Sequence, residues 1–268
     1  MNPVEIVRGN SPIVLGIPHT GTHLPDHIFC SLNATGQELT DTDWHVDRLY
    51  DELLNDVTVV RATFHRYVID ANRDPAGGSL YPGQNTTGLV PLTDFDGEPI
   101  WKTDPGPEEI SVRLKQFHNP YHIALASELR RVRQLNGVAV LYDCHSIRSE
   151  IPFLFEGTLP DLNIGTNEGK TCSPEIEKAV TRICKNATGF SCVANGRFKG
   201  GWTTRHYGRP EINIHAIQME LAQSTYLKSE TSPFEYDEIM ALSLRVHLKS
   251  ILETLANLAL TLEQTHEH

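Results

Sequence analysis

Two histidines in this sequence each follow a short apolar segment. Val138–Tyr142 (VAVLY) leads into His145, and Ile13–Ile17 (IVLGI) leads into His19. Apolar segments of this length are typical of strands that are buried on both faces of a sheet. A single histidine in a turn of glycine and proline, like His19 between Pro18 and Gly21, would be interpreted as a solvated loop residue. Because ligands in open α/β sheets bind outside the carboxyl ends of the strands, two such histidines favour a functional site.

Carboxylates occur close to the same predicted strand ends. Asp143 directly follows the strand that leads to His145, and Asp43 lies in the first turn of a predicted helix. Acids at a helix N-terminus also complement the helix dipole, so Asp43 has a second explanation. Glu220 interrupts an apolar segment, INIHAIQMEL, and carboxylates are rarely buried without a partner or a task.

These residue types are the ones that catalytic zinc sites use. Two histidines and one carboxylate, with water in an open fourth position, form such a site. At this stage either Asp43 or Asp143 could be the carboxylate, because the spacing is not a compact motif such as HExxH. Glu220 is the candidate general base for the metal-bound water, a role that needs a carboxylate outside the ligand set.

A nucleophile activated by His145 is the alternative, and Cys144 or Ser146 would be that nucleophile. We rank this alternative lower, because adjacent residues of a strand point to opposite faces of the sheet. Cys144 is better explained as a small buried side chain.

The elements that position these residues alternate between strands and helices. This order predicts an α/β fold in which a layered sheet carries helices on both sides. No internal repeat or linker divides the chain, so we predict one domain over residues 1–268. The predicted strands are 13–17, 57–64, 67–69, 138–142, 162–165 and 212–221, and the predicted helices are 40–54, 108–136 with a break at Pro120, 174–186 and 236–264.

Two segments carry no regular pattern. Residues 75–107 are rich in Gly, Pro, Thr and Asp, and loops of this length are usually functional lids or disordered. The apolar residues near Val90 and Trp101 predict that this segment is anchored to the body of the protein. Residues 195–210 (NGRFKGGWTTRHYGRP) are glycine-rich and basic, which suits either a loop that closes over an anionic ligand or an ordinary surface hairpin.

Composition excludes several classes of partner. The formal net charge of -11 argues against nucleic acid, whose phosphates need basic surfaces. The sequence has no apolar run of about eighteen residues and no apolar core of a signal peptide, so we expect neither a membrane span nor secretion. The five cysteines form no CxxC pair, which favours free thiols in a reducing cytoplasm. Composition does not predict the oligomeric state.

Over nearly its whole length the sequence resembles the N-formylglutamate amidohydrolase (N-formylglutamate deformylase) family. The resemblance implies a three-layer α/β/α sandwich with a mixed central sheet, similar to zinc carboxypeptidases. It also implies hydrolysis of N-formyl-L-glutamate to formate and L-glutamate, the last step of one route of histidine degradation. The motifs that carry it are IPHTG at Ile17, DTDWHVDRLYD at Asp41, NRDP at Asn72, LYDCHSIRSEIPFLFEG at Leu141, NIGTNEG at Asn163, NGRFKGGWTTRHYG at Asn195 and AIQMEL at Ala216.

The resemblance also suggests a ligand set. Carboxypeptidases place a glutamate ligand three residues after the first histidine, but here that residue is Thr22. We therefore choose Asp43 over His45 or Asp143 as the third ligand of Zn²⁺, or of another divalent metal, beside His19 and His145. Asp143 then orients His145 from behind, and Glu220 acts as the general base on the metal-bound water that attacks the formyl carbon.

The implied substrate carries two carboxylates, which arginine recognises through paired hydrogen bonds. The candidate anchors are Arg73, Arg148 and Arg205, with Asn72 beside them, although each arginine could instead form a surface ion pair. Two other functions stay open. An amidohydrolase for another N-acyl amino acid would share every residue except the arginines, and a non-catalytic ligand-binding protein would need a vestigial metal site.

Overall fold

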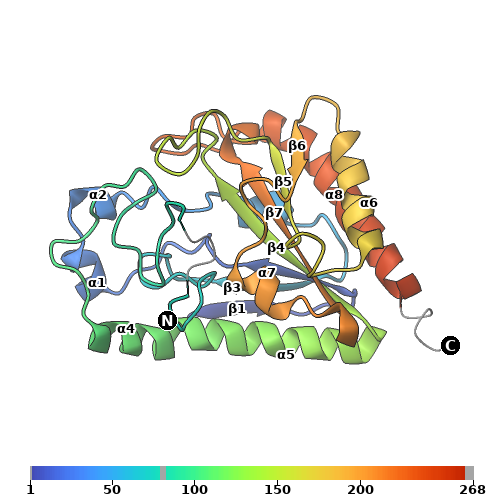
Figure 1. Ribbon diagram of the computed structural model, residues 1–268, viewed down its shortest axis with the longest axis horizontal. Coiled ribbons are helices and arrows are strands. Elements are labelled where there is room, and N and C mark those ends of the chain that lie inside the picture. The colour runs from blue at the N-terminus through green and yellow to red at the C-terminus, as the bar shows by residue number, and fades with distance from the viewer. Residues whose placement is uncertain (1, 79–82, 263–268) are drawn as a thin grey trace.

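A mixed seven-stranded sheet forms the centre of the protein (Figure 1). The computed structural model describes residues 2–78 and 83–262. The strand order is β1-β3-β2-β4-β7-β5-β6. The four central strands, β3, β2, β4 and β7, are parallel, whereas β1 pairs antiparallel with β3 and β5 pairs antiparallel with β7. The strands are β1 (Val4–Val7), β2 (Ile13–Ile17), β3 (Thr58–Ala62), β4 (Ala139–Ile147), β5 (Leu162–Gly165), β6 (Cys192–Ala194) and β7 (Ile214–Ala222).

Helices cover both faces of this sheet, which confirms the predicted three-layer α/β/α fold (Figure 1). Val140 and Tyr142 of β4 pack on the side of α6 and α8, and the intervening Leu141 packs on the side of α5. The α-helices are α1 (Asp26–Ser31), α2 (Ala34–Gln37), α3 (Val46–Tyr50), α4 (Pro107–Arg113), α5 (Asn119–Asn136), α6 (Pro174–Lys185), α7 (Trp202–Tyr207) and α8 (Glu238–Leu262). Three short helices, η1 (Leu114–His118, π type), η2 (Pro210–Ile212) and η3 (Gln223–Thr225), complete the set.

The helices with the clearest sequence signals begin and end near their predicted positions. Ser173 caps α6, because its hydroxyl accepts a hydrogen bond from the amide of Ile176. Gly137 follows α5 in the left-handed conformation that glycine adopts easily. The predicted C-terminal helix is confirmed from Glu238 to Leu262, and its last predicted residues, 263–264, lie outside the described residues.

The break predicted at Pro120 takes a different form. The chain stays helical from Pro107 to Asn136, but a π-helical turn, Leu114–His118, replaces the break one turn earlier. Pro120 occupies the first turn of α5, where a missing amide hydrogen costs little. The amide of Asn119 donates to the carbonyl of Leu114, five residues back, which closes the wider turn.

Three other predictions about elements are wrong in detail. Residues 67–69 are buried, but no strand in the described part of the chain pairs with them, and residues 66–68 form a turn. The helix expected from residue 40 begins only at Val46, since the preceding His45 adopts a left-handed conformation with φ of 58°. Helix α7 lies inside the segment 195–210, where the sequence predicted a loop or hairpin.

The central strand is also longer than predicted. It continues from residue 142 to Ile147, because β7 pairs with it over the whole length of β4. Asp143 and His145 therefore lie within the strand and not beyond its end.

Residues 83–107 contain no helix or strand before α4 begins. Val90, Ile100 and Trp101 are buried in the core beside α5, which confirms the predicted anchoring of this segment. Residues 79–82 of the predicted loop lie outside the described residues. Within residues 2–78 and 83–262, no helix is long and apolar enough to cross a membrane.

Candidate active site

The parallel pairing of β2, β4 and β7 brings the two histidines and Glu220 together. His145 of β4 lies opposite Glu220 of β7 in the strand register. His19 follows the neighbouring strand β2, and its ring centroid lies 5.0 Å from that of His145. The loop before α3 is hydrogen-bonded to the loop that carries His19, because the backbone amide of Asp43 donates to the carbonyl of His19 at 3.1 Å.

Three side-chain atoms of this cluster face a common centre. Asp43 Oδ2 lies 3.2 Å from His145 Nδ1 and 3.7 Å from His19 Nδ1. His19, Asp43 and His145 together offer ligand atoms that all lie within 4.8 Å of one another, a spacing suited to one metal ion. His19 Nδ1 is buried and has no hydrogen-bond partner among the described residues. A buried nitrogen in this state is costly unless a cation uses its lone pair, so the residues fit a metal site.

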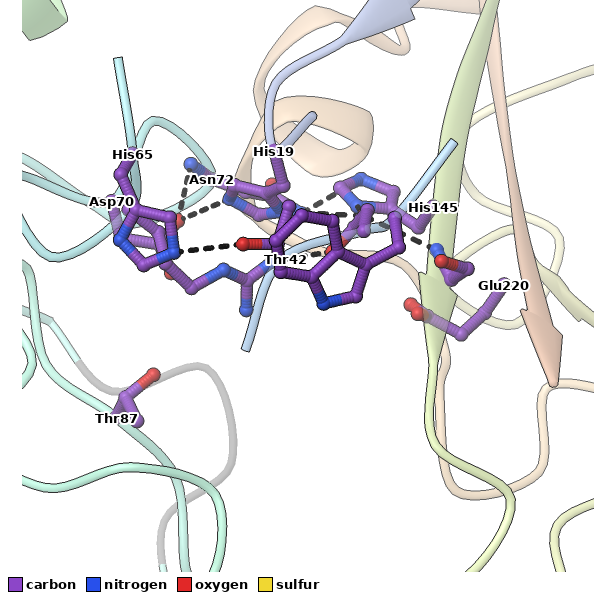
Figure 2. Close-up of polar contacts among 12 residues, drawn as sticks. His19, Thr42, His65, Asp70, Asn72, Thr87, His145 and Glu220 are labelled. Carbon is purple, nitrogen blue, oxygen red and sulfur yellow. Dashed lines mark hydrogen bonds and ion pairs between the residues drawn. The ribbon is translucent and has the colours of Figure 1, made fainter. Parts of the chain in front are cut away.

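A carboxylate lies beside the Nε2 atom of each imidazole, and Figure 2 shows the one of Asp70 at His19. Asp70 Oδ1 lies 2.7 Å from His19 Nε2, and Asp143 Oδ1 lies 3.2 Å from His145 Nε2. Carboxylates accept hydrogen bonds, so Nε2 of His19 carries its proton and Nδ1 is left with a lone pair. Such carboxylate–histidine pairs fix the tautomer and the orientation of metal-binding histidines. Asn72 Nδ2 also lies 3.1 Å from His145 Nε2, and because an amide nitrogen only donates, this Nε2 bonds either to Asn72 or to Asp143 and not to both.

The site carries an excess of negative charge. Burial alone would raise the pKa of Asp43, but the Arg66 guanidinium and His19 outweigh it and hold that pKa well below its usual range. Arg66 is itself buried, and its Nη2 donates to Asp43 Oδ1 at 2.9 Å. Burial would lower the pKa of His145, yet Asp143 and Asp43 raise it well above the ordinary value. The surroundings therefore favour a positive charge between the two imidazoles, either a proton or a cation.

Glu220 lies beside the cluster and outside its ligand set. Burial raises the pKa of this carboxyl group to about 7. Its Oε2 accepts a hydrogen bond from Gln218 Nε2 at 3.0 Å, and Gln218 Oε1 accepts from the amide of Gly201 at 2.6 Å. A carboxyl group with a pKa near neutrality can both accept and return a proton at physiological pH.

A small cavity opens onto the cluster. His19, His145 and Glu220 contribute to its wall, and the rest of the wall combines apolar residues with polar ones. The polar residues of the lining include Arg66, Asn72, Arg73, Asn85, Thr86, Arg197 and Gln218, and the apolar residues include Phe95, Leu154 and Phe198.

Two of the predicted substrate anchors do not line this cavity. Arg148 Nη2 pairs with Asp96 Oδ2 at 2.7 Å, and Arg205 Nε donates to the carbonyl of Gly200 at 2.8 Å. Arg73 and Asn72, the other two predicted anchors, are part of the lining.

Residues of the alternative assignments have other partners. His45 Nε2 bonds to the carbonyl of Phe234 at 2.9 Å, away from the cluster. Asp143 Oδ2 accepts from the hydroxyl of Thr204 at 2.9 Å, which keeps this carboxylate behind His145. Cys144 packs in the core on the opposite face of β4, as its alternation with His145 predicted. Ser146 bonds to the hydroxyl of Tyr226 at 2.7 Å.

Sequence reasoning did not assign four residues of the site: Asp70, Arg66, Gln218 and Arg197. Asp70 precedes Asn72 in a polar segment after an apolar run, which is the signal that identified the other candidates. Gln218 lies two residues before Glu220 and so shares its face of the strand. Arg66 and Arg197 lie in turns without periodicity, and their sequence context carries no comparable signal.

Comparison with known proteins identifies relatives that agree with one another in family and in fold. A model of the N-formylglutamate amidohydrolase family matches residues 11–227. The N-formylglutamate deformylases of Pseudomonas putida and Pseudomonas aeruginosa are 47% and 45% identical to this chain, over 92% of it and 93% and 94% of their own lengths. The crystal structure of N-formylglutamate amidohydrolase from Ralstonia eutropha JMP134 matches with a TM-score of 0.79 at 25% identity, over 97% of this chain and 98% of that one. A structure from Agrobacterium tumefaciens, at 16% identity and a TM-score of 0.73 over 95% and 94% of the two chains, shares the fold.

Proposed function

Because the chain belongs to the N-formylglutamate amidohydrolase family, whose members are amide-hydrolysing enzymes, we propose that it hydrolyses N-formyl-L-glutamate to formate and L-glutamate. This is the last step of one route of histidine degradation. The observation that carries the proposal is the convergence of His19, Asp43 and His145 beside the buried Glu220, with both histidines and Glu220 in the wall of one cavity.

We infer that His19, Asp43 and His145 hold a divalent cation, with Zn²⁺ as the first candidate. When bound, such an ion supplies Lewis-acid chemistry, since it lowers the pKa of water and polarises a carbonyl oxygen. Asp70 and Asp143 keep the two imidazoles in the orientation that ligation requires. Arg66 holds Asp43 ionised, so this side chain can act as a ligand at neutral pH.

Glu220 is the proposed general base. In its ionised form it takes a proton from the water that attacks the formyl carbon, and it then delivers that proton to the amine of the leaving glutamate. Its position opposite His145 in the β4–β7 register places it next to the ligand set without joining it. Gln218 restricts the carboxylate to one orientation through the 3.0 Å hydrogen bond.

The arginines of the cavity are the proposed anchors for the substrate. N-formylglutamate carries two carboxylates, and Arg73 and Arg197 both line the cavity, beside Asn72 and Asn85. We therefore transfer the anchoring role predicted for Arg148 and Arg205 to Arg197, and keep it for Arg73. Paired recognition by arginine favours a dicarboxylate over an uncharged N-formyl amino acid.

The test is amide hydrolysis by the purified protein, measured as release of the free amino acid from N-formyl-L-glutamate, N-formyl-L-aspartate and N-acetyl-L-glutamate. We expect N-formyl-L-glutamate to give the highest kcat/KM of the three. His145→Ala should abolish formate release and lower bound zinc, because it removes one of three ligands. His27→Ala, at an exposed histidine outside the site, is the matched control. Higher activity on the acetyl substrate would instead indicate an amidohydrolase for another N-acyl amino acid, and turnover by metal-free protein would overturn the metal assignment.

A further inference from the structure

Three histidines surround Trp202, outside the cluster of His19, Asp43 and His145. His118 ends the π turn, His122 lies one turn further in α5, and His206 belongs to α7. The ring of His122 lies 4.3 Å from that of His118 and 4.8 Å from that of Trp202. The ring of His206 stacks on that of Trp202, with 4.3 Å between the ring centroids. None of these histidines lines the cavity or belongs to the ligand cluster.

Two of these histidines bond to the backbone of one short segment. His122 Nε2 lies 2.8 Å from the carbonyl oxygen of Ala71, and His118 Nε2 lies 3.1 Å from that of Arg73. A carbonyl oxygen only accepts, so each Nε2 carries a proton and donates it. Burial lowers the pKa of His122 to about 3, so its ring is neutral and its Nδ1 accepts from the hydroxyl of Tyr207, 3.0 Å away.

The opposite side of the same segment contacts the metal-binding histidines. Asp70 supports His19 at 2.7 Å, and Asn72 lies 3.1 Å from His145 Nε2. The side chains of residues 70 and 72 thus face the cluster, whereas the carbonyls of residues 71 and 73 face α5. Among the described residues no strand pairs with residues 70–73, so their backbone is held by the two bonds to these carbonyls and by the amide of Asp70, which donates to the carbonyl of Leu89 at 2.7 Å.

The helical segment that carries the two histidines presents both of them to residues 70–73. His118 and His122 are four residues apart and share one helix face. His118 is the last residue of the π turn Leu114–His118 and His122 lies in α5 just after it, and π turns inside α-helices occur frequently at functional sites.

We propose that His118 and His122 are positioning residues that hold the segment 70–73, so that Asp70 and Asn72 orient the two metal-binding imidazoles. They act through the backbone and touch neither substrate nor metal. The catalytic consequence rests on the proposed function, whereas the consequence for metal affinity does not depend on which substrate the enzyme hydrolyses.

The experiment compares His122→Phe, which keeps an aromatic ring but loses the donor, with His122→Gln, which restores an N–H donor. His206→Phe, in the same aromatic cluster without a bond to the segment, is the control. We expect His122→Phe to weaken Zn²⁺ binding by the metal-depleted protein about tenfold or more, measured by competition with a chelating dye. Its kcat should fall by a similar factor with a smaller change in KM, and His122→Gln should recover most of both losses.

Zinc affinity and kcat of His122→Phe within twofold of the wild type would overturn the proposal. It would also fail if His122→Gln were as impaired as His122→Phe, because the donor would then be irrelevant. Should His122→Phe not fold, His118→Phe and His118→Gln form a second pair that is judged by the same criteria. Weaker zinc binding by His122→Gln than by the wild type would still contradict the role of the N–H donor. Wild-type protein that bound zinc but released no formate would overturn the proposed function and leave the affinity comparison to decide this inference.

Discussion

At the scale of single residues, the two imidazoles of the site have the same environment. Each ring directs Nδ1 toward Asp43 and Nε2 toward a carboxylate of its own, Asp70 for His19 and Asp143 for His145. The arrangement directs the Nδ1 atoms of both rings at one carboxylate oxygen of Asp43. Glu220 is the carboxylate that remains without such a pairing, and its raised pKa suits proton transfer.

Glu220→Gln should lower kcat by roughly a hundredfold or more, because a positioned general base contributes about that much. The amide keeps the shape of the side chain and its contact with Gln218, so we expect the protein to fold and to retain its zinc. Steady-state formate release and metal analysis of the same preparation measure the two effects separately. Glu211→Gln, at an exposed position in η2, should leave kcat unchanged. Loss of zinc in parallel with activity would make Glu220 a ligand.

At the scale of elements, register and loop contacts determine what each residue can reach. The β4–β7 register places His145 opposite Glu220, and one backbone bond joins the Asp43 loop to His19. Helix α5 supports the other side of the sheet and is attached to it through Glu128. This residue is 1% exposed and pairs with Arg131 at 2.6 Å and with Arg8 at 2.9 Å. Arg131 also donates hydrogen bonds to the hydroxyl of Thr58, at the start of β3, and to the carbonyl of Gly9.

Glu128→Gln should lower the free energy of unfolding at pH 7 by about 2 kcal/mol, the usual worth of a hydrogen bond to a charged group. Burial alone would raise the pKa of Glu128, but Arg131 and Arg8 outweigh it and lower the pKa below 4.5. The unfolded state therefore binds the proton more readily, so this stabilisation is present above pH 4.5 and is lost as the pH falls through the folded-state pKa.

Urea unfolding from pH 7 down to about pH 3, which passes below the unfolded-state pKa, measures this dependence. The difference between Glu128→Gln and the wild type should shrink as the pH falls. Glu253→Gln, on the exposed face of α8, should show no comparable difference at either end of the range. A difference that stayed constant with pH would mean that packing, and not the ion pairs, stabilises α5 at this position.

At the scale of the whole molecule, the site joins segments that span most of the chain. Its residues follow or belong to β2, the loop before α3, the turn after β3, and the strands β4 and β7. A ligand that binds the folded state alone stabilises all of these segments together, because the unfolded chain does not hold the three ligands in place.

Removal of bound metal with a chelator should therefore lower Tm as well as abolish activity. At free Zn²⁺ one hundred times Kd the expected stabilisation is about 2.7 kcal/mol, which corresponds to a Tm increase of roughly 5–10 °C for a chain of this size. Thermal unfolding of chelator-treated protein with and without added Zn²⁺ measures the effect. His145→Ala should lack this shift, and a wild-type Tm that did not respond to zinc would contradict the proposed ligand set.

The sequence by itself determined the elements whose side chains recur with a regular period. The apolar spacing of α8, the capped start of α6 and the buried strands at 13–17 and 162–165 follow from local rules, since burial of one face requires that spacing. Residue type and position also selected His19, His145 and Glu220. The family resemblance, confirmed by comparison, added the reaction.

The tertiary structure decided which residues meet. Of the three candidate ligands Asp43, His45 and Asp143, it is Asp43 that faces both His19 and His145. Arg148 and Arg205 lie outside the cavity. Asp43, His45 and Arg148 lie in loops or turns and Arg205 lies in the short helix α7, so no period along the sequence marks them. Their contacts depend on loop geometry and on hydrogen bonds between segments far apart in the chain, and those form only when the layers of the fold pack together.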